Sequence, residues 1–394
     1  MDVLGIVLNV LAVLAAISSF LVLLFLLLTH RNAPRFLESI QSIKQVNEKP
    51  RVSVIITARN EEDELSRCLG SLIRQDYPDL EVILVDDSSA DRTLAIAESI
   101  RKLDRRIRIV EAGQREEGWI GKSWPCWKGY QCADGDLLLF VDADSEFLKA
   151  STVSDAVNYL LVKEYDMFSI SPKVRLDSVW ASSTLPLVSS AIDLLYPMMK
   201  VNDPPSDRAY VFGTFILVKR AVYEAIDGHR KVRKSLVEDA AIAQDTKAKG
   251  YKLRIEVGTE FLATDWEHEL SKIYSGLERI MSTSIQGYGL VSNVNTILLF
   301  FLALYPILFV IGFALNPQSE YFTGAIASVL NIIFFLSIFA TESRLVAKKA
   351  GLRVLLYPLG VLIFMSAIFT TSLKVRNGKG IDWKGRSYQQ IVNK

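Results

Sequence analysis

The sequence predicts an α/β fold class, a domain with a doubly wound sheet that carries transmembrane segments at both ends. Between residues 50 and 262, β-branched apolar runs of strand length alternate with segments of helical apolar spacing. This alternation is typical of a sheet whose strands are mainly parallel. Residues 4–28 and three later stretches near 294–315, 322–340 and 352–373 are largely apolar. Each is long enough to cross a bilayer.

The composition narrows the possible partners. The chain has 394 residues and a net charge of +1, so its bulk charge does not indicate a nucleic-acid partner, and we expect none. Mean hydropathy is +0.24, and the excess of apolar residues is concentrated in the four stretches. Cys68, Cys126 and Cys132 have neither metal-binding nor disulfide spacing and fit a reducing compartment. The oligomeric state is not indicated.

Residues 1–30 are predicted to be a retained membrane anchor rather than a signal peptide. A signal peptide has a basic start and a small-residue cleavage site, which this segment lacks, and its apolar core is longer. Basic residues follow the anchor, and the positive-inside rule then predicts that the next domain is cytoplasmic, at the cell membrane. These residues are Arg31, Arg35, Lys44, Lys49 and Arg51.

Four strands and three helices are predicted in the first half of the α/β domain. Helices are expected near 62–72, from a cap at Ser88 or Ser89 to about Lys102, and near 123–133. The strands are Val52–Ile56, Leu80–Val85, Arg106–Val110 and the apolar run before Asp142.

Polar clusters stand at the ends of three of these strands. They are Thr57–Glu61, Asp86-Asp87 and Asp142-Ala143-Asp144. Ligands of doubly wound sheets bind at the carboxyl ends of the strands. Two carboxylates one residue apart at a buried strand end repel each other, and a hard divalent cation together with phosphate oxygens relieves that repulsion. The alternative for an isolated Asp-x-Asp is an acidic turn after a strand.

The second half of the domain has a less regular pattern. Strands are predicted at Met167–Ile170 and Phe215–Val218, and a helix at Leu236–Lys249. Residues 182–201 are apolar and contain two prolines. They fit either an interfacial, acceptor-facing segment or an ordinary part of the core.

Together, these motifs resemble the family 2 glycosyltransferases, whose donor-binding domain has the GT-A fold, a Rossmann-like mixed sheet. The resemblance covers about residues 50–260 and depends on four motifs in order. These motifs are Val52–Glu62, Val85–Ser89, Asp142–Asp144 and Val237–Asp239.

The resemblance implies roles for individual residues. Asp144 is the expected direct ligand of Mg²⁺ or Mn²⁺, with Asp142 near the metal, ribose and diphosphate, and Asp87 accepts a hydrogen bond from uracil. Asp239 is the expected general base, and one base without a protein nucleophile implies inversion. The alternative for Glu238-Asp239 is an acidic pair that favours a helix start. The other expected donor-binding residues are Thr57, Ala58, Arg59, Glu61 and Glu238.

A narrower resemblance links the chain to the membrane-bound, lipid-directed carotenoid and hopanoid-type glycosyltransferases. It rests on residues 118–124, 226–239 and 380–388, and it implies that Lys122 neutralises donor phosphate. Gly121-Lys122-Ser123 is not a Walker A loop, because that loop needs glycine where Glu116 stands. His229 is expected either to contact a substrate or to be structural. Asp227 replaces a glycine usual in those relatives, which puts the local backbone geometry in question.

The carboxyl-terminal tail, residues 374–394, carries a possible active-site lid. Trp383 would cover the donor, while Lys384 and Arg386 would contact its diphosphate. The alternative is a basic anchor at anionic lipid. The Gln-x-x-Arg-Trp motif of processive members is missing, with Arg279 and Gln286 as weak substitutes. Its absence favours a single transfer.

Residues 263–293 are predicted to form interfacial amphipathic helices, beginning near Trp266, and residues 294–373 form the later transmembrane segments. Three full crossings would place the basic tail outside, away from the donor site. We therefore predict a cytoplasmic tail and one segment that does not fully cross. Pro358 and Gly360 would break 352–373 into a re-entrant turn.

The predicted function is an inverting, metal-dependent transfer of a sugar from a nucleotide-diphosphate donor, favouring a UDP-sugar, to a membrane lipid acceptor. The lipid would approach beside residues 182–201 and 270–300. The alternatives are a processive polysaccharide synthase and a non-catalytic membrane scaffold.

Overall fold

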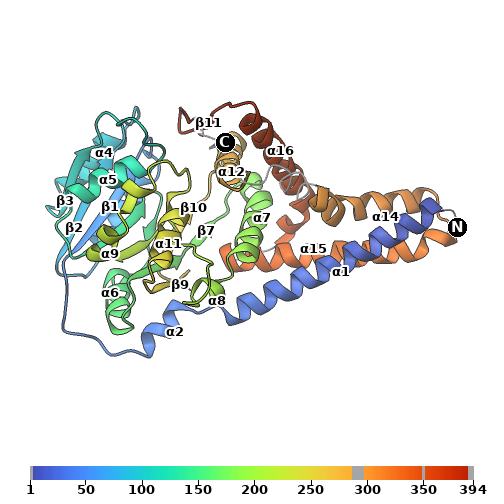
Figure 1. Cartoon of the computed structure of the whole chain (residues 1–394), viewed down its shortest axis with the longest axis horizontal. Helices are drawn as coiled ribbons and strands as arrows, with labels where there is room; N and C mark the ends of the chain where they lie inside the picture. Colours follow the sequence, from blue (N-terminus) through green and yellow to red (C-terminus); the bar gives the residue numbers. More distant parts are fainter. Residues whose placement is uncertain (1–2, 286–296, 348–350, 389–394) are drawn as a thin grey trace.

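The structure, a computed structural model, describes residues 3–285, 297–347 and 351–388. Figure 1 shows an α/β domain on one side and long helices extending away from it on the other. The predicted stretch 286–293 lies outside the described residues.

A seven-stranded mixed sheet forms the centre of the α/β domain, in the order β3-β2-β1-β4-β8-β6-β9. Its first half is parallel, as the sequence predicts, whereas β8 lies antiparallel between β4 and β6. The strands are β1 (Val52–Ala58), β2 (Leu80–Asp86), β3 (Ile107–Glu111), β4 (Leu137–Asp142), β6 (Met167–Ser171), β8 (Ile216–Lys219) and β9 (Leu253–Val257).

Successive residues of β1 face opposite sides of the sheet, and each side is covered by helices. Val54 and Ile56 belong to one buried cluster with residues of α3 and α6, whereas Ile55 belongs to a second with residues of α5 and α11. The helices around the sheet are α2 (Phe36–Gln41), α3 (Leu65–Ile73), α4 (Thr93–Arg101), α5 (Ser123–Gln131), α6 (Thr152–Val162), α8 (Met198–Val201), α9 (Arg220–Ala225), α10 (Gly228–Lys231) and α11 (Glu238–Ala248).

A small second sheet, in the order β5-β10-β7, begins shortly after the end of β4. It consists of β5 (Glu146–Phe147), β10 (Leu262–Asp265) and β7 (Lys173–Arg175). Arg67 and Arg175 both contact Asp265 across it.

Four helical segments are long and apolar enough to span a membrane, which indicates membrane association: residues 3–32, 297–315, 319–347 and 351–376. We use "helical assembly" for these segments together with α7 and α12. Its elements are α1 (Val3–Asn32), α7 (Val179–Leu195), α12 (Leu270–Ile285), the π-helix η1 (Phe300–Leu304), α14 (Tyr305–Leu315), the 3₁₀ turn η2 (Ser319–Tyr321), α15 (Phe322–Ala347), the 3₁₀ segment η3 (Gly351–Leu356) and α16 (Tyr357–Arg376).

The helical assembly has two parts. Helices α1, α14 and α15 pack together into a long bundle, whereas α16 packs against α7 and α12 and rises toward the α/β domain (Figure 1). Within the stretch 182–201, α7 packs between α15 and α16, whereas Leu194, Leu195 and Met199 are exposed.

The prediction that Pro358 and Gly360 break this last segment is wrong, because α16 is continuous over both residues. Pro358 lies in the first turn, where no backbone N–H donor is needed. At Gly360 a Cβ atom would lie only 1.7 Å from the Ser183 carbonyl oxygen, so glycine permits close packing of α16 on α7.

Candidate functional site

The polar ends of β1, β2 and β4 meet at one edge of the sheet. Thr57 is in register with Asp142 on one side, and Ala58 with Asp86 on the other. The clusters expected to converge from the sequence are therefore adjacent in space. We call Asp87, Lys122, Asp142 and Asp144 the strand-end site.

The loop after β1 is fixed by bonds to the loop after β2. Asp87 N donates to the Ala58 carbonyl oxygen at 2.9 Å. Arg59 Nη1 donates to the carbonyl oxygens of Asp87 at 2.6 Å and Ser88 at 3.2 Å. Glu61 N donates to Thr93 Oγ1 at 2.7 Å. The Arg59 side chain thus holds the two loops together.

Asp87 is buried between two arginines. Its Oδ2 accepts from Arg115 Nη2 at 3.1 Å and from Arg386 Nη1 at 2.6 Å. Its Oδ1 is buried and has no hydrogen-bond partner among the described residues. Arg115 was missed by the sequence analysis, since it stands in a loop without a strand or helix pattern.

Lys122 lies directly against Asp142, and its Nζ donates to Asp142 Oδ1. Burial opposes the charge on the lysine, but the Asp142 carboxylate raises the pKa of Lys122 above its ordinary value. Burial likewise opposes the charge on Asp142, yet Lys122 lowers the pKa of Asp142. The pair is therefore charged, and Lys122 stands at the strand end where a phosphate would need a cation.

Asp144 has the environment of a carboxylate that lacks a cation. Its Oδ1 is buried without a hydrogen-bond partner in the described part of the chain. Burial, followed by the charges of Asp142 and Glu61, raises the pKa of Asp144 to about 8. A divalent ion would remove this penalty, and carboxylate oxygens are the ligands that Mg²⁺ and Mn²⁺ prefer. The residues present fit such an ion.

Asp239, in the first turn of α11, faces the same space as Asp142. A Cβ atom added at Gly213 would lie 3.0 Å from Asp239 Oδ2 and 3.5 Å from Asp142 Oδ2. Gly213 therefore keeps open the gap between the expected base and the strand-end site. The sequence analysis missed Gly213, whose only signal is a glycine shortly before β8.

Burial and neighbouring charges shift the pKa values of Glu238 and Asp239. Burial raises the pKa of Asp239, and Arg279 of α12 opposes that shift. Burial and then Asp239 raise the pKa of Glu238 to about 7. Arg279 also donates to the Leu236 carbonyl oxygen at 3.1 Å, just before α11. Arg279, which in the sequence is only a weak substitute for the missing motif, thus lies at the site.

The tail residues form a hairpin over the strand-end site. We call β11 (Ile381–Trp383) and β12 (Arg386–Tyr388) the tail hairpin; its turn residues, Lys384 and Gly385, both have positive φ. Lys384 Nζ donates to Glu61 Oε1, and Arg59 Nε donates to the Lys384 carbonyl oxygen at 3.0 Å. The hairpin therefore reaches both the first and the second strand-end loops. The Trp383 side chain lies outside the described structure.

His229 has a structural role in this arrangement. It is 2% exposed, and its Nδ1 lies 2.9 Å from the Tyr223 hydroxyl oxygen. Asp227 adopts the left-handed conformation, with φ of 62°, and accepts from Arg230 Nε at 2.7 Å. The aspartate thus takes the backbone conformation for which glycine is usual.

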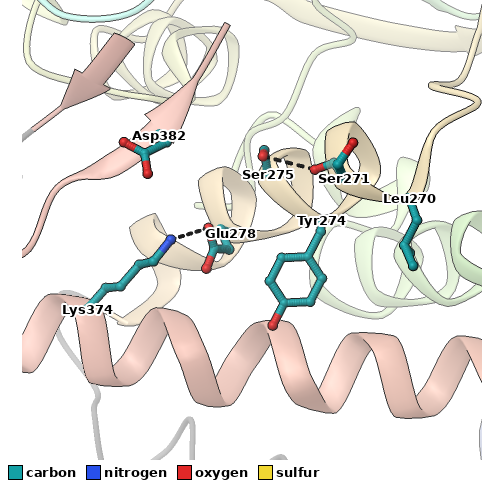
Figure 2. A pocket seen from close by; sticks show the side chains of 7 residues that line it. All are labelled: Leu270, Ser271, Tyr274, Ser275, Glu278, Lys374 and Asp382. Carbon is teal, nitrogen blue, oxygen red and sulfur yellow. Dashed lines mark hydrogen bonds and ion pairs between the residues drawn. The ribbon is translucent and has the colours of Figure 1, made fainter. Parts of the chain in front are cut away.

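A groove of about 530 Å³ opens between α12, α16 and the tail hairpin. Figure 2 shows Lys374 of α16 reaching Glu278 of α12, at 2.7 Å between Nζ and Oε2. The Tyr274 hydroxyl oxygen is 2.9 Å from both Ser366 Oγ and Thr370 Oγ1. This groove lies outside the strand-end site, and its polar contacts tie α16 to α12. It is lined by Leu270, Ser271, Tyr274, Ser275, Glu278, Lys374 and Asp382.

Known proteins are similar to this chain both in sequence and in fold. The chain is 26% identical over 347 residues to the 4,4'-diaponeurosporenoate glycosyltransferase of Staphylococcus aureus strain bovine RF122, which covers 86% of this chain and 88% of the relative. The relative from strain MRSA252 matches with the same figures.

A solved structure with a similar fold is the mannosyltransferase PcManGT from Pyrobaculum calidifontis in complex with GDP-Man and Mn²⁺. The likeness has a TM-score of 0.52 at 16% identity and covers 93% of this chain and 98% of that one. It supports the GT-A-like fold. Residues 53–227 match the family model described as Glycosyl transferase family 2, so the chain carries a family 2 glycosyltransferase domain and is a glycosyltransferase.

Proposed function

We propose that the enzyme transfers one sugar from a nucleotide-diphosphate donor, a UDP-sugar, to a membrane lipid with inversion at the anomeric carbon. The observation that carries this proposal is the gap beside Gly213, where the carboxylates of Asp239 and Asp142 face one another. A base and a diphosphate-binding strand end must meet in this way for an acceptor hydroxyl to attack a bound sugar.

Asp239 acts as the general base in this proposal. Its carboxylate takes the proton of the acceptor hydroxyl as that oxygen attacks the anomeric carbon, and the bond from this carbon to the diphosphate oxygen breaks. General-base catalysis of this kind contributes roughly 10²–10⁴-fold. The raised pKa of Asp239 makes it a stronger base than an exposed aspartate.

The strand-end site binds the donor. A divalent cation held by Asp144, with Asp142 beside it, would neutralise charge on the leaving diphosphate, and Mn²⁺ accompanies GDP-Man in the PcManGT complex. Lys122, Lys384 and Arg386 would supply further positive charge. Asp87 Oδ1 is available to accept a hydrogen bond from the base of the nucleotide.

A row of three aromatic rings in contact supports the proposal that the acceptor is apolar. Tyr196, just beyond α7, stacks on Tyr210 with ring centroids 5.5 Å apart, and Tyr210 contacts Phe212 edge-on at 5.2 Å. Phe212 precedes Gly213, so the row leads from the helical assembly to the base. The Staphylococcus aureus relatives are named for a diaponeurosporenoate acceptor, which fits an extended, carotenoid-type lipid.

The helix arrangement suggests the membrane orientation. If α1, α14 and α15 each cross the membrane and α16 lies at its surface, the domain and the tail share the cytoplasmic side. This orientation agrees with the basic residues that follow α1. It also permits the contacts of Lys384 and Arg386 at the donor site.

Cysteine labelling in sealed vesicles tests the orientation. In a chain whose Cys132 is replaced by serine, we expect Ser387→Cys to react only with reagent on the cytoplasmic side. Ser319→Cys, at the far end of the bundle, is the matched control and should react only from outside. Labelling of Ser387→Cys only from outside would end the proposal that the tail closes over the donor.

Mass spectrometry of membrane lipids tests the activity. We expect an apolar lipid with one added hexosyl unit in membranes that contain the protein, and no such product with Asp239→Asn. A long polymer would instead identify a processive synthase. Absence of any product and of donor hydrolysis with Mn²⁺ would favour a non-catalytic scaffold.

A further inference from the structure

Three ionisable side chains from distant parts of the sequence meet where the helical assembly joins the α/β domain. His30 lies near the end of α1, Asp193 near the end of α7 and Glu342 near the end of α15. We call them the junction cluster. These helix ends converge beside the α/β domain (Figure 1).

The cluster is compact enough for a single ion. His30 Nε2 lies 2.8 Å from Asp193 Oδ2 and 3.3 Å from Glu342 Oε1, and one donor atom from each residue lies within 4.8 Å of the others. Two ligands about 2.1 Å from a tetrahedral metal are roughly 3.4 Å apart. The observed separations therefore need only small side-chain adjustments to surround a metal.

The protein contacts alone do not satisfy the cluster. Glu342 is 0% exposed. Its carboxylate lies near the Ser189 side chain and 3.3 Å from His30 Nε2, but neither oxygen has a well-formed hydrogen bond among the described residues. His30 Nδ1 is also buried without one. A buried carboxylate that lacks hydrogen bonds is costly, and Asp144 Oδ1 shows the same feature at the strand-end site.

The excess negative charge of the cluster also favours a bound cation. In the described ranges, no lysine or arginine forms a salt bridge with Asp193 or Glu342. Two carboxylates therefore face one imidazole, which can carry at most one positive charge. A divalent ion neutralises both carboxylates and accepts the imidazole nitrogen as a ligand.

The geometry points to a second metal site, in which His30, Asp193 and Glu342 bind a divalent transition-metal ion that joins α1, α7 and α15. One imidazole and two carboxylates suit Zn²⁺ better than Mg²⁺, which retains its waters and prefers oxygen. Among first-row ions, Zn²⁺ binds such a site more tightly than Mn²⁺. The ion fastens α1 and α15 to α7 within the helical assembly, and three protein ligands leave one position for water.

Metal content of the full-length protein in detergent tests the site. Asp144→Asn serves as the background, because it removes the expected ligand of the strand-end metal. After equilibration with Zn²⁺ and desalting, elemental analysis should find about one zinc per chain in this background. Adding Glu342→Gln or His30→Gln should reduce zinc at least tenfold. His268→Gln, which changes an exposed histidine, is the matched control and should keep the zinc.

Thermal unfolding distinguishes a metal site from a structural ion pair. Zn²⁺ should raise the unfolding temperature of Asp144→Asn, since an ion that binds only the folded state stabilises it, and this rise should vanish with Glu342→Gln. Asp193→Asn replaces Glu342→Gln if the latter does not fold. A chain with Asp144→Asn that retains no zinc, or equal zinc with and without Glu342→Gln, would overturn the proposal.

Discussion

In the sheet, the polar groups stand on the ends of adjacent parallel strands, whereas in the helical assembly they join elements that are far apart in the sequence. Asp142 lies beside Thr57 because β4 pairs with β1 in register. His30 meets Glu342 only because α1 packs along α15. Strand pairing thus concentrates function at a sheet edge, while helix packing places polar groups wherever two apolar faces end.

This contrast predicts how each region responds to mutation. A change at the sheet edge should remove chemistry while the fold remains, since the strands are held by backbone ladders and an apolar core. A change among the helices should alter how the tail and the helices are held, except at Arg279 of α12, whose charge acts on Asp239. Four variants test this distinction, beginning with the largest expected effect.

Replacing the expected base should have the largest effect. Asp239→Asn removes a proton acceptor and keeps the shape, so we expect a loss of turnover of about 10²–10⁴-fold with donor binding retained. Initial rates and calorimetric donor titration measure the two quantities. Asp245→Asn, on the same helix, is the control and should remain active. Normal transfer by Asp239→Asn would refute the assignment of the base.

Arg279 should control the pH dependence of that base. Burial raises the pKa of Asp239 and Arg279 opposes the shift, so Arg279→Gln should raise this pKa further. The active form of a base is deprotonated, and activity is therefore lost as the pH falls through its pKa. We expect the acid limb of the kcat profile to move to higher pH.

Lys272→Gln, one α12 residue whose side chain pairs with Glu269 instead, is the control for that profile. An acid limb that stays in place in Arg279→Gln, while kcat falls at every pH, would mean that Arg279 acts only by position. In that case α12 would hold the site in place without changing the pKa of Asp239.

The meeting of the strand-end carboxylates at one edge of the sheet was largely predictable from the sequence, and the physical reason is local. Asp87, Asp142 and Asp144 directly follow apolar strands, and parallel strands align their ends. The antiparallel placement of β8 was not visible, because Ile216–Lys219 has the same apolar composition as a parallel strand. Gly213 and Arg115 lie in loops, where only tertiary contacts give a residue its role.

The helices show the opposite outcome. Their apolar stretches are evident from composition, but hydrophobicity does not say which helices pack side by side. The packing of α16 on α7 depends on the absence of a side chain at Gly360, and the junction cluster depends on three residues spread over more than 300 positions. Pro358 misled the prediction because proline breaks a helix interior but fits its first turn.

The tail hairpin connects the two regions, and its arginine should have a moderate effect. Arg386 donates a charge-assisted hydrogen bond to the buried Asp87, and such bonds contribute about 1.5–3 kcal/mol. Arg386→Ala should raise the KM for donor by roughly tenfold or more, with a smaller change in kcat. Steady-state kinetics over a donor series measures the split.

Two further variants sharpen that result. Arg386→Lys keeps the charge and loses the two-pronged donor geometry, so it should restore only part of the affinity. Ser387→Ala, at the exposed neighbouring position, should leave the KM unchanged. An unchanged donor KM in Arg386→Ala would assign the hairpin to membrane anchoring instead.

The smallest effect is expected in the groove between α12 and α16. Tyr274→Phe removes the hydroxyl that lies 2.9 Å from both Ser366 Oγ and Thr370 Oγ1. Since this contact is partly exposed, its loss should cost about 0.5–1.5 kcal/mol and lower the unfolding temperature by a few degrees, with donor KM unchanged. Ser271→Ala, in the same groove, should have no such effect. If Tyr274→Phe instead changes the donor KM as strongly as Arg386→Ala, the position of α16 controls the tail hairpin, and the two regions act as one unit.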